Sequence, residues 1–411
     1  MSEQEKAREK QVPEEENTHA GQETPQETAS VPKDAKPEQP VANSGGDAGA
    51  VRPSGGKKFR WQKRYSALLA AALVALTPAA SVSAAGRLLK PVDEAGYEEP
   101  DDRTGSGSAS VSSGANISVK LLKQVARDYD IDPDFLDEID GKKSIRQSTL
   151  KSYAREYGLP AQYVQRFFDD CFVFKTGNTL EYIPIESGIP KNHIDWNSLT
   201  RRSNGELRYG NARKGIDVSE FQGTINWDQV KASGVDFAFI RVGYRGYGTG
   251  KLNYDSRYQQ NIEGALDAGI DVGVYFYSQA VNRSEALEEA RMLLDAIDGY
   301  DITYPVVLDI EGAPSASART SRLTPRTTTQ IVDAFCGAVE DAGYTPMVYS
   351  YTKWFIEKMD LAAISEYDVW LAQYYKVPFY PYKLDILQYS STGRVNGISG
   401  NVDMNIAFTR Y

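Results

Sequence analysis

Short apolar runs alternate with amphipathic stretches through the second half of the chain. Runs with the length and the Val, Ile, Tyr and Phe content of β-strands lie at 215–218, 237–244, 271–278, 305–311, 345–351, 368–374, 385–390 and 402–408. Helical spacing separates the early runs, as in 284–298 and 325–342. This alternation predicts a parallel sheet in an α/β fold. About eight strands in roughly 200 residues indicate a closed β/α barrel. We expect the barrel to be irregular, because its later connections are too short for full helices.

The fourth run, 305–311, ends in two carboxylates. Side chains alternate along a strand, so Asp309 and Glu311 should point to the same side. Gly312 then lets the chain turn away. Two neighbouring buried carboxyl groups raise the pKa of at least one of them, as a general acid at neutral pH requires. The alternative interpretation is that both acids cap the next helix or lie in solvent at the strand end.

Further acids lie near the ends of other predicted strands. In barrels of this kind the active site lies at the C-terminal ends of the strands. Asp217, Asp309, Glu311 and Asp403 all fall there or close to a strand end. Acids that converge from several strands indicate a site more strongly than any one of them does.

The composition limits the kinds of catalytic, metal and nucleic-acid sites that the chain can form. The net charge of −10 argues against a nucleic acid partner, which needs clustered Lys and Arg. His19 and His193 are the two histidines, and Cys171 and Cys336 are the two cysteines. No nucleophile motif accompanies His193, and two cysteines cannot form a four-thiolate metal site. We therefore expect carboxylates, aromatic side chains and amides to carry the chemistry, without a metal or an organic cofactor.

The composition of residues 1–114 predicts a disordered tail, an apolar segment and a linker. Residues 1–56 are polar and low in large apolar residues, which is typical of disorder. The basic cluster 57–64 precedes the charge-free segment 66–85, a transmembrane anchor or a signal peptide. A buried soluble helix is the third and weakest alternative. Under both leading interpretations the rest of the chain is extracytoplasmic, after a flexible linker at 86–114. Residues 66–85 contact the membrane if they are not cleaved.

Residues 115–213 combine a weak internal repeat with a connecting region. Leu122, Ala126 and Phe135 recur as Leu150, Ala154 and Tyr163 at the same spacing. Each copy predicts two helices joined by a turn, and two such pairs would form a small bundle. This bundle is either a binding module or a plain helical spacer. Residues 171–213 have no assigned role.

Residues 214–411 resemble the glycoside hydrolase family 25 muramidases, a lysozyme family with an irregular β/α barrel. The motifs that carry the resemblance are KGIDVSEFQG at 214–223, VLDIE at 307–311, VWLAQY at 369–374, LQYSS at 387–391 and GNVDMN at 400–405. They occur in order and at plausible spacing. Some relatives carry a His between the aromatics of the third strand, where this chain has Phe276. We expect that difference to bear on subsite preference rather than on the core chemistry.

The resemblance implies hydrolysis of the β-1,4 bond between N-acetylmuramic acid and N-acetylglucosamine in peptidoglycan. It implies Glu311 as the general acid and Asp309 as the partner that orients the N-acetyl group or the attacking water. Asp217 and Asp403 would be supporting acids. This agrees with the chemistry of glycoside cleavage, which needs one protonated carboxyl group and a second acid.

Aromatic and amide side chains near the acids are candidate substrate-binding residues. Tyr277 and Trp370 are candidate sugar platforms, and packing inside the barrel is the alternative for these two. Tyr275, on the same face of its strand as Tyr277, is a further candidate substrate-binding residue. Gln388 is a candidate hydrogen-bonding partner of a sugar hydroxyl or amide. The expected protein is a cell-wall hydrolase, membrane-anchored or secreted, whose partner is the glycan strand. The alternative is a catalytically inactive protein that binds cell-wall glycan.

Overall fold

The computed structural model describes residues 115–313, 315 and 317–411. The expected tail, apolar segment and linker, residues 1–114, lie outside this part. Among the described residues, none of the helices combines the length and the apolar character needed to cross a membrane.

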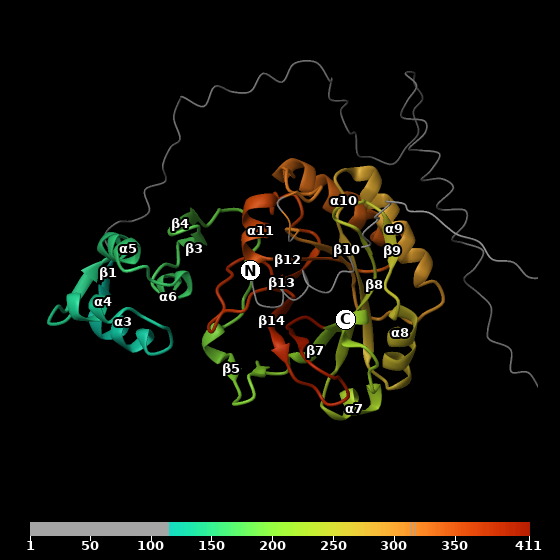
Figure 1. Cartoon of the computed structure of the whole chain (residues 1–411), viewed down its shortest axis with the longest axis horizontal. Coiled ribbons are helices and arrows are strands. Elements are labelled where there is room, and N and C mark those ends of the chain that lie inside the picture. The colour runs from blue at the N-terminus through green and yellow to red at the C-terminus, as the bar shows by residue number, and fades with distance from the viewer. Residues whose placement is uncertain (1–114, 314, 316) are drawn as a thin grey trace, which may run out of the picture. The chain divides into compact units, whose positions relative to one another are not determined.

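Eight strands of the C-terminal region close into a barrel (Figure 1). They are β7 (Arg213–Val218), β8 (Phe237–Arg245), β10 (Asp271–Ser278), β11 (Val306–Ile310), β12 (Pro346–Tyr351), β13 (Asp368–Ala372), β14 (Ile386–Gly393) and β15 (Val402–Ala407). The order around the barrel is β10-β11-β12-β13-β14-β15-β7-β8, and a pairing of β8 with β10 closes it. The eight predicted strands are confirmed, with ends that shift by up to three residues.

The expectation of a wholly parallel sheet is wrong for one strand. The pairs from β7 through β14 are parallel, but β15 is antiparallel to both of its neighbours, β14 and β7. The physical reason is the connection, because residues 394–401 are too few for the crossover that a parallel pair requires. A tight return instead brings the start of β15 to the end of β14.

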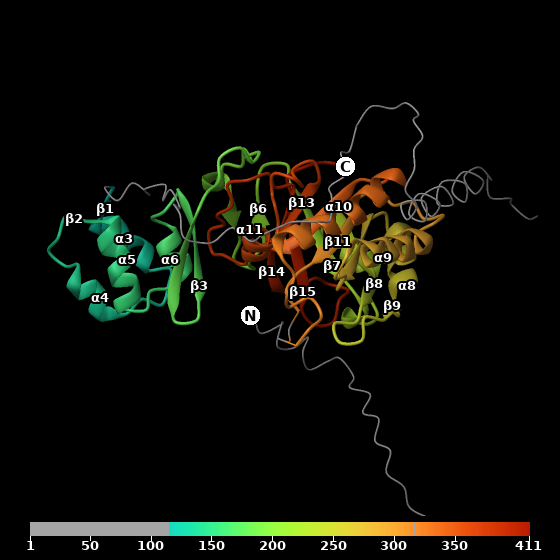
Figure 2. The ribbon, with the colours of Figure 1, turned by 90° about the horizontal axis from the view of Figure 1, so that it is seen from above.

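Helices cover the outside of the early strands (Figures 1 and 2). They are α7 (Trp227–Ala232), α8 (Tyr258–Asp267), α9 (Arg283–Ala296), α10 (Pro325–Asp341) and α11 (Thr352–Lys358). The two helices predicted near 284–298 and 325–342 are confirmed as α9 and α10. Asn282 caps α9 and Thr324 caps α10, each accepting a hydrogen bond from a backbone N–H of the first turn. A short strand, β9 (Leu252–Tyr254), pairs with β8 outside the barrel.

Aromatic side chains fill the inside of the barrel. Phe237 stacks on Tyr304 with 4.6 Å between ring centroids, and Phe239 stacks on Trp370 at 4.4 Å. Room for these rings comes from glycine, since an added Cβ at Gly215 would lie 2.2 Å from the Phe237 ring. This layer, the aromatic plug, comprises Phe237, Phe239, Tyr275, Tyr304, Tyr349 and Trp370, all buried.

The repeat in the first part of the described chain forms a small helical module. Its elements are β1 (Asn116–Ser118), α3 (Val119–Ala126), α4 (Pro133–Glu138), β2 (Ser144–Arg146), α5 (Gln147–Glu156) and α6 (Ala161–Gln165). The repeated positions form its core, since Leu122, Phe135, Leu150 and Tyr163 are each fully buried. The two predicted helix pairs are confirmed. The sequence did not predict β1 and β2, which pair with each other and begin the two copies.

The connecting region packs against the late side of the barrel, within the same compact unit. Its elements are the hairpin β3 (Cys171–Thr176) and β4 (Thr179–Pro184), the 3₁₀ turn η1 (Trp196–Ser198), and the pair β5 (Thr200–Arg201) and β6 (Leu207–Arg208). Phe172 is buried and contacts the rings of Phe379, Tyr380 and Tyr382. The apolar runs of 171–213 therefore belong to an interface with the barrel.

We predict that Gly215→Ala destabilises the barrel. The added methyl group would collide with Phe237, which cannot retreat because it is buried and stacked on Tyr304. Overpacking of this kind costs about 1–3 kcal/mol, and each kcal/mol lowers Tm by roughly 2–4 °C in a domain of this size. Thermal unfolding followed by circular dichroism measures the change.

The matched control is Gly337→Ala in α10. An added Cβ there has nothing within 4 Å. Alanine is the better helix former by about 0.5–1 kcal/mol, so this variant should keep or raise Tm. Equal effects of the two substitutions would contradict the packing assigned to Gly215.

Candidate active site

The predicted acids meet at one end of the barrel, the C-terminal mouth of its parallel strands. Asp217 lies near the end of β7 and Asp309 near the end of β11, and Glu311 follows β11 directly. Asp403 is near the start of β15, but that strand runs in the opposite direction, so its start lies at the same mouth. The register pairs Asp403 with Asp217 on neighbouring strands. All four acids thus lie at strand ends on one side of the barrel, although the sequence analysis did not predict the direction of β15.

Two side-chain amides hold the carboxylate of Asp217. Asp217 is 3% exposed. Its Oδ2 accepts hydrogen bonds from Nε2 of Gln388 and Nδ2 of Asn405, both at 2.8 Å. A buried carboxylate is costly unless donors of this kind solvate it. The two amides thus supply the donors that keep Asp217 in place at the mouth.

Aromatic side chains fix the direction of both amides. Oε1 of Gln388 accepts hydrogen bonds from the hydroxyls of Tyr349 at 2.9 Å and Tyr374 at 2.6 Å. Oδ1 of Asn405 accepts one from the indole Nε1 of Trp370 at 2.8 Å. Because these donors occupy the amide oxygens, the amide nitrogens must face Asp217. The orientation follows from the hydrogen-bond network and not from an arbitrary choice of amide rotamer.

The end of β11 is fixed from the neighbouring strand. In the sheet register Asp309 lies between Tyr277 of β10 and Tyr349 of β12, and it is buried. The hydroxyl of Ser350 donates to the carbonyl of Ile310 at 2.7 Å, which holds the backbone between the two acids. Glu311, past the strand end, is partly exposed.

Gly312 has a different role from the expected one. Its φ is outside the left-handed region, so the turn itself does not require glycine. An added Cβ would lie 2.9 Å from the hydroxyl of Tyr351 and 3.3 Å from the ring of Trp354. Glycine is needed because the backbone after Glu311 passes close to these two side chains.

Three of the predicted substrate-binding residues have other surroundings in the structure. Trp370 is 1% exposed inside the aromatic plug, so its ring faces are covered by protein and the sugar-platform prediction is wrong for it. Tyr275 is likewise buried in the plug. Gln388 is buried and bonded to Asp217, which makes it a positioning residue. Tyr277 is partly exposed and stays a candidate platform.

A charged group beside the end of β7 was missed by the sequence reasoning. Arg241 of β8 donates from Nε to Asp255 at 2.8 Å and from Nη2 to Glu220 at 3.1 Å. Its guanidinium lies 4.9 Å from the ring centroid of Phe221, which is 41% exposed. Arg241 interrupts the apolar run 237–242 of β8, and this was the signal that could have marked it.

The cysteines take no part in the chemistry. Cys171 and Cys336 are both free and buried. Burial raises the pKa of the Cys171 thiol to about 12 and that of the Cys336 thiol well above its ordinary value. Neither forms a thiolate at neutral pH. Within the described part of the chain, no group of three or more His, Cys, Asp or Glu side chains is arranged to hold a metal ion.

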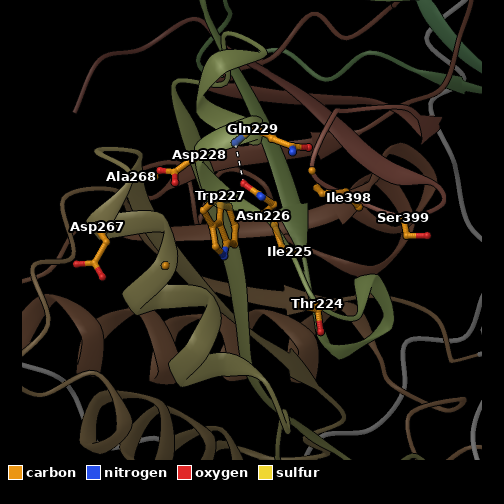
Figure 3. A pocket seen from close by; sticks show the side chains of 12 residues that line it. Thr224, Ile225, Asn226, Trp227, Asp228, Gln229, Asp267, Ala268, Ile398 and Ser399 are labelled. Carbon is orange, nitrogen blue, oxygen red and sulfur yellow. Dashed lines mark hydrogen bonds between the residues drawn. The ribbon is translucent and has the colours of Figure 1, made fainter.

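A separate pocket is formed around Trp227. Its volume is ≈ 780 Å³, and Figure 3 shows Trp227 at its centre, between Asp267 at the end of α8 and Ile398 of the β14–β15 connection. None of the four acids lines it. A second pocket of ≈ 510 Å³ includes Tyr374, so it adjoins the network around Asp217. Chemistry and hydrogen bonding, rather than pocket size, identify the mouth as the site.

Comparison with known proteins agrees with this geometry. Residues 216–398 match the family model for glycosyl hydrolases family 25. Lysozyme M1 of Streptomyces globisporus is 33% identical over 204 residues, which are 47% of this chain and 66% of that protein. The autolytic lysozyme of Clostridium acetobutylicum is 28% identical over 194 residues, which are 47% of this chain and 55% of that protein. The chain thus spans less than two thirds of each of these relatives.

Solved structures give similar matches. The bacterial lysozyme of Streptomyces coelicolor is 28% identical, with a TM-score of 0.39 over 48% of this chain and 92% of that one. The modular autolysin LytC of Streptococcus pneumoniae is 25% identical, with a TM-score of 0.45 over 59% of this chain and 57% of that one. Residues 216–398 are thus similar to the glycosyl hydrolases of family 25, whose family model they match.

Proposed function

We propose that this protein hydrolyses the β-1,4 bond between N-acetylmuramic acid and N-acetylglucosamine in peptidoglycan. The observation that carries the proposal is the hydrogen-bonded acid cluster at the barrel mouth. Asp217 is fixed there by two oriented amides, in register with Asp403 and at the same mouth as Asp309 and Glu311. The family match and the lysozyme relatives support it.

Glu311 and Asp309 have different roles in glycoside cleavage. Glu311 is the general acid that protonates the leaving oxygen, since it lies past the strand end and is the least buried of the four. Asp309, two residues earlier on the same side of the strand, orients the N-acetyl group or the attacking water. A negatively charged partner stabilises the positive charge that develops at the sugar. Both groups stand on a strand end that Ser350 holds in place.

Asp217 and Asp403 set the electrostatics around these two groups. Fixed dipoles and charges stabilise a transition state best when they need no reorganisation during the reaction. The paired amides and their tyrosine and tryptophan donors give Asp217 such a fixed position. Tyr277, partly exposed beside Asp309, is the remaining candidate platform for a sugar ring.

The substrate places the protein outside the cytoplasm. Peptidoglycan lies beyond the cytoplasmic membrane, and the relatives include an autolytic lysozyme. The apolar segment 66–85 would deliver the barrel there, as an anchor or as a cleaved signal.

We predict that Glu311→Gln abolishes most of the activity with little effect on stability. The amide keeps the shape of the side chain but cannot donate a proton to the leaving oxygen. Loss of a general acid lowers the rate by about 10²–10⁴-fold. The assay measures new reducing ends released from purified peptidoglycan by the full chain.

Glu340→Gln is the matched control, because Glu340 is exposed near the end of α10, which leads into the start of β12 at the end of the barrel opposite the mouth. It should keep wild-type activity. Full activity in the Glu311→Gln variant would show that another residue is the acid. A wild-type chain that binds peptidoglycan without releasing reducing ends would favour the inactive glycan-binding alternative.

We also predict that Tyr349→Phe combined with Tyr374→Phe lowers kcat through Asp217. Without the two hydroxyls, the amide of Gln388 is free to turn its oxygen toward the carboxylate. A hydrogen bond contributes about 0.5–1.5 kcal/mol, so the double variant should lose roughly tenfold in kcat, with a shifted pH profile of the rate.

Adding Gln388→Leu to the Tyr349→Phe, Tyr374→Phe variant tests whether the tyrosines affect kcat through Gln388. If the tyrosines act through Gln388, the extra substitution adds less than it does in the wild type. Tyr300→Phe removes a tyrosine hydroxyl bonded to Glu263 at the surface and should leave the rate unchanged. Full additivity of the effects would contradict the network.

A further inference from the structure

A pocket beside the acid cluster is formed by three separate parts of the chain. Its volume is ≈ 510 Å³. The barrel contributes Tyr374 after β13 and Tyr389 and Thr392 of β14, the connecting region contributes Arg201, and the helical module contributes Tyr129 and Gln162. β13 and β14 are parallel, and these barrel residues lie toward their C-terminal ends. The pocket therefore opens at the same mouth as the acids.

Tyr374 joins the pocket to the acid cluster. Its hydroxyl donates to Gln388, which in turn donates to Asp217. Its ring lines the pocket and is 40% exposed. One side chain thus extends from the hydrogen-bond network of the acids into the pocket, and a ligand bound at the mouth can continue over this ring.

The pocket is bounded by contacts of both the helical module and the connecting region with the barrel. From the module, Asp128 forms an ion pair with Nζ of Lys376 at 2.8 Å. From the connecting region, Nη2 of Arg201 donates to the carbonyl of Tyr375 at 3.4 Å, and Phe172 packs against Tyr380 and Tyr382. Burial raises the pKa of Tyr375 to about 12, so its hydroxyl is neutral at physiological pH.

The cations of the pocket are already committed to protein partners. Lys376 is paired with Asp128. Arg201 donates to the carbonyls of Gly205 and Tyr375, and its guanidinium lies 5.8 Å from the ring centroid of Tyr389. The pocket lining also includes the ring of Tyr374, which is 40% exposed, together with hydroxyl and amide groups of Thr392 and Gln162. Apolar flat surfaces with a few polar groups suit a neutral sugar better than an acidic peptide.

We infer that this pocket is a distal subsite for the glycan strand, built jointly by the helical module and the late strands of the barrel. The inference rests on the proposed function, because the strand that is cleaved at the acids is the strand that continues into the pocket. It gives the helical module a role in substrate binding, in place of a plain spacer. Longer glycans should therefore bind more tightly than short ones.

The test uses the full chain with Glu311→Gln, which prevents turnover, and N-acetylglucosamine oligomers of three and six sugars. Calorimetry gives Kd for each. We expect the hexamer to bind at least about tenfold more tightly than the trimer, equivalent to about 1.4 kcal/mol. Tyr129→Ala with Gln162→Ala should remove most of this advantage and leave trimer binding unchanged. Gln124→Ala, on the exposed face of α3 outside the pocket, is the matched control.

Hydrogen exchange locates the bound sugar independently of any substitution. The hexamer, but not the trimer, should slow exchange of the amides near residues 128–130 and 161–163. Equal Kd values for the two oligomers, without protection of these amides, would overturn the subsite. A wild-type chain that fails to release reducing ends from peptidoglycan, while the hexamer still protects the module, would overturn the proposed function and leave the sugar subsite standing.

Discussion

The hydrogen bonds from Gln388 and Asn405 to Asp217 are the interaction on which the acid cluster depends. A buried carboxylate needs donors, and the partners of the two amide oxygens fix the amides with their nitrogens toward Asp217. Tyr349, Tyr374 and Trp370 provide those partners. Tyr349 and Trp370 are members of the aromatic plug. The packing of the aromatic plug therefore fixes the positions of the side chains at the mouth. A change in the plug should also change the hydrogen bonds to Asp217.

Much of this arrangement could be predicted from the sequence. The strands are apolar runs of ordinary length, and the run 305–311 ends, as expected, with Asp309 and Glu311 at the end of β11. The antiparallel course of β15 was also within reach, because 394–401 is too short for a parallel crossover. In the helical module the repeat predicted the helix pairs, and its apolar positions Leu122, Ala126, Phe135, Leu150, Ala154 and Tyr163 form part of the buried core.

The partners of the acids could not be predicted in this way. Strands of a helix-covered barrel are buried on both faces, so their composition does not show which side chains point inward. The sequence therefore left two roles open for Trp370, sugar binding and packing inside the barrel. Asn405, although it lies in the motif at 400–405, and Tyr349 were assigned no role, because their function depends on contacts with residues far away in the sequence, such as Asp217 and Gln388.

Residues 171–212 cover the side of the barrel on which the connection 373–385 lies. The connection 373–385, all of it described, contains no helix, so this side lacks the cover that α9 and α10 give the early strands. The connecting region supplies it through Phe172, and Arg201 extends the cover to Tyr375 and Tyr389. Tyr374, whose hydroxyl orients Gln388, lies in this same connection. The network around Asp217 is therefore supported by segments outside residues 216–398, and the family match is smaller than the unit that holds the acids in place.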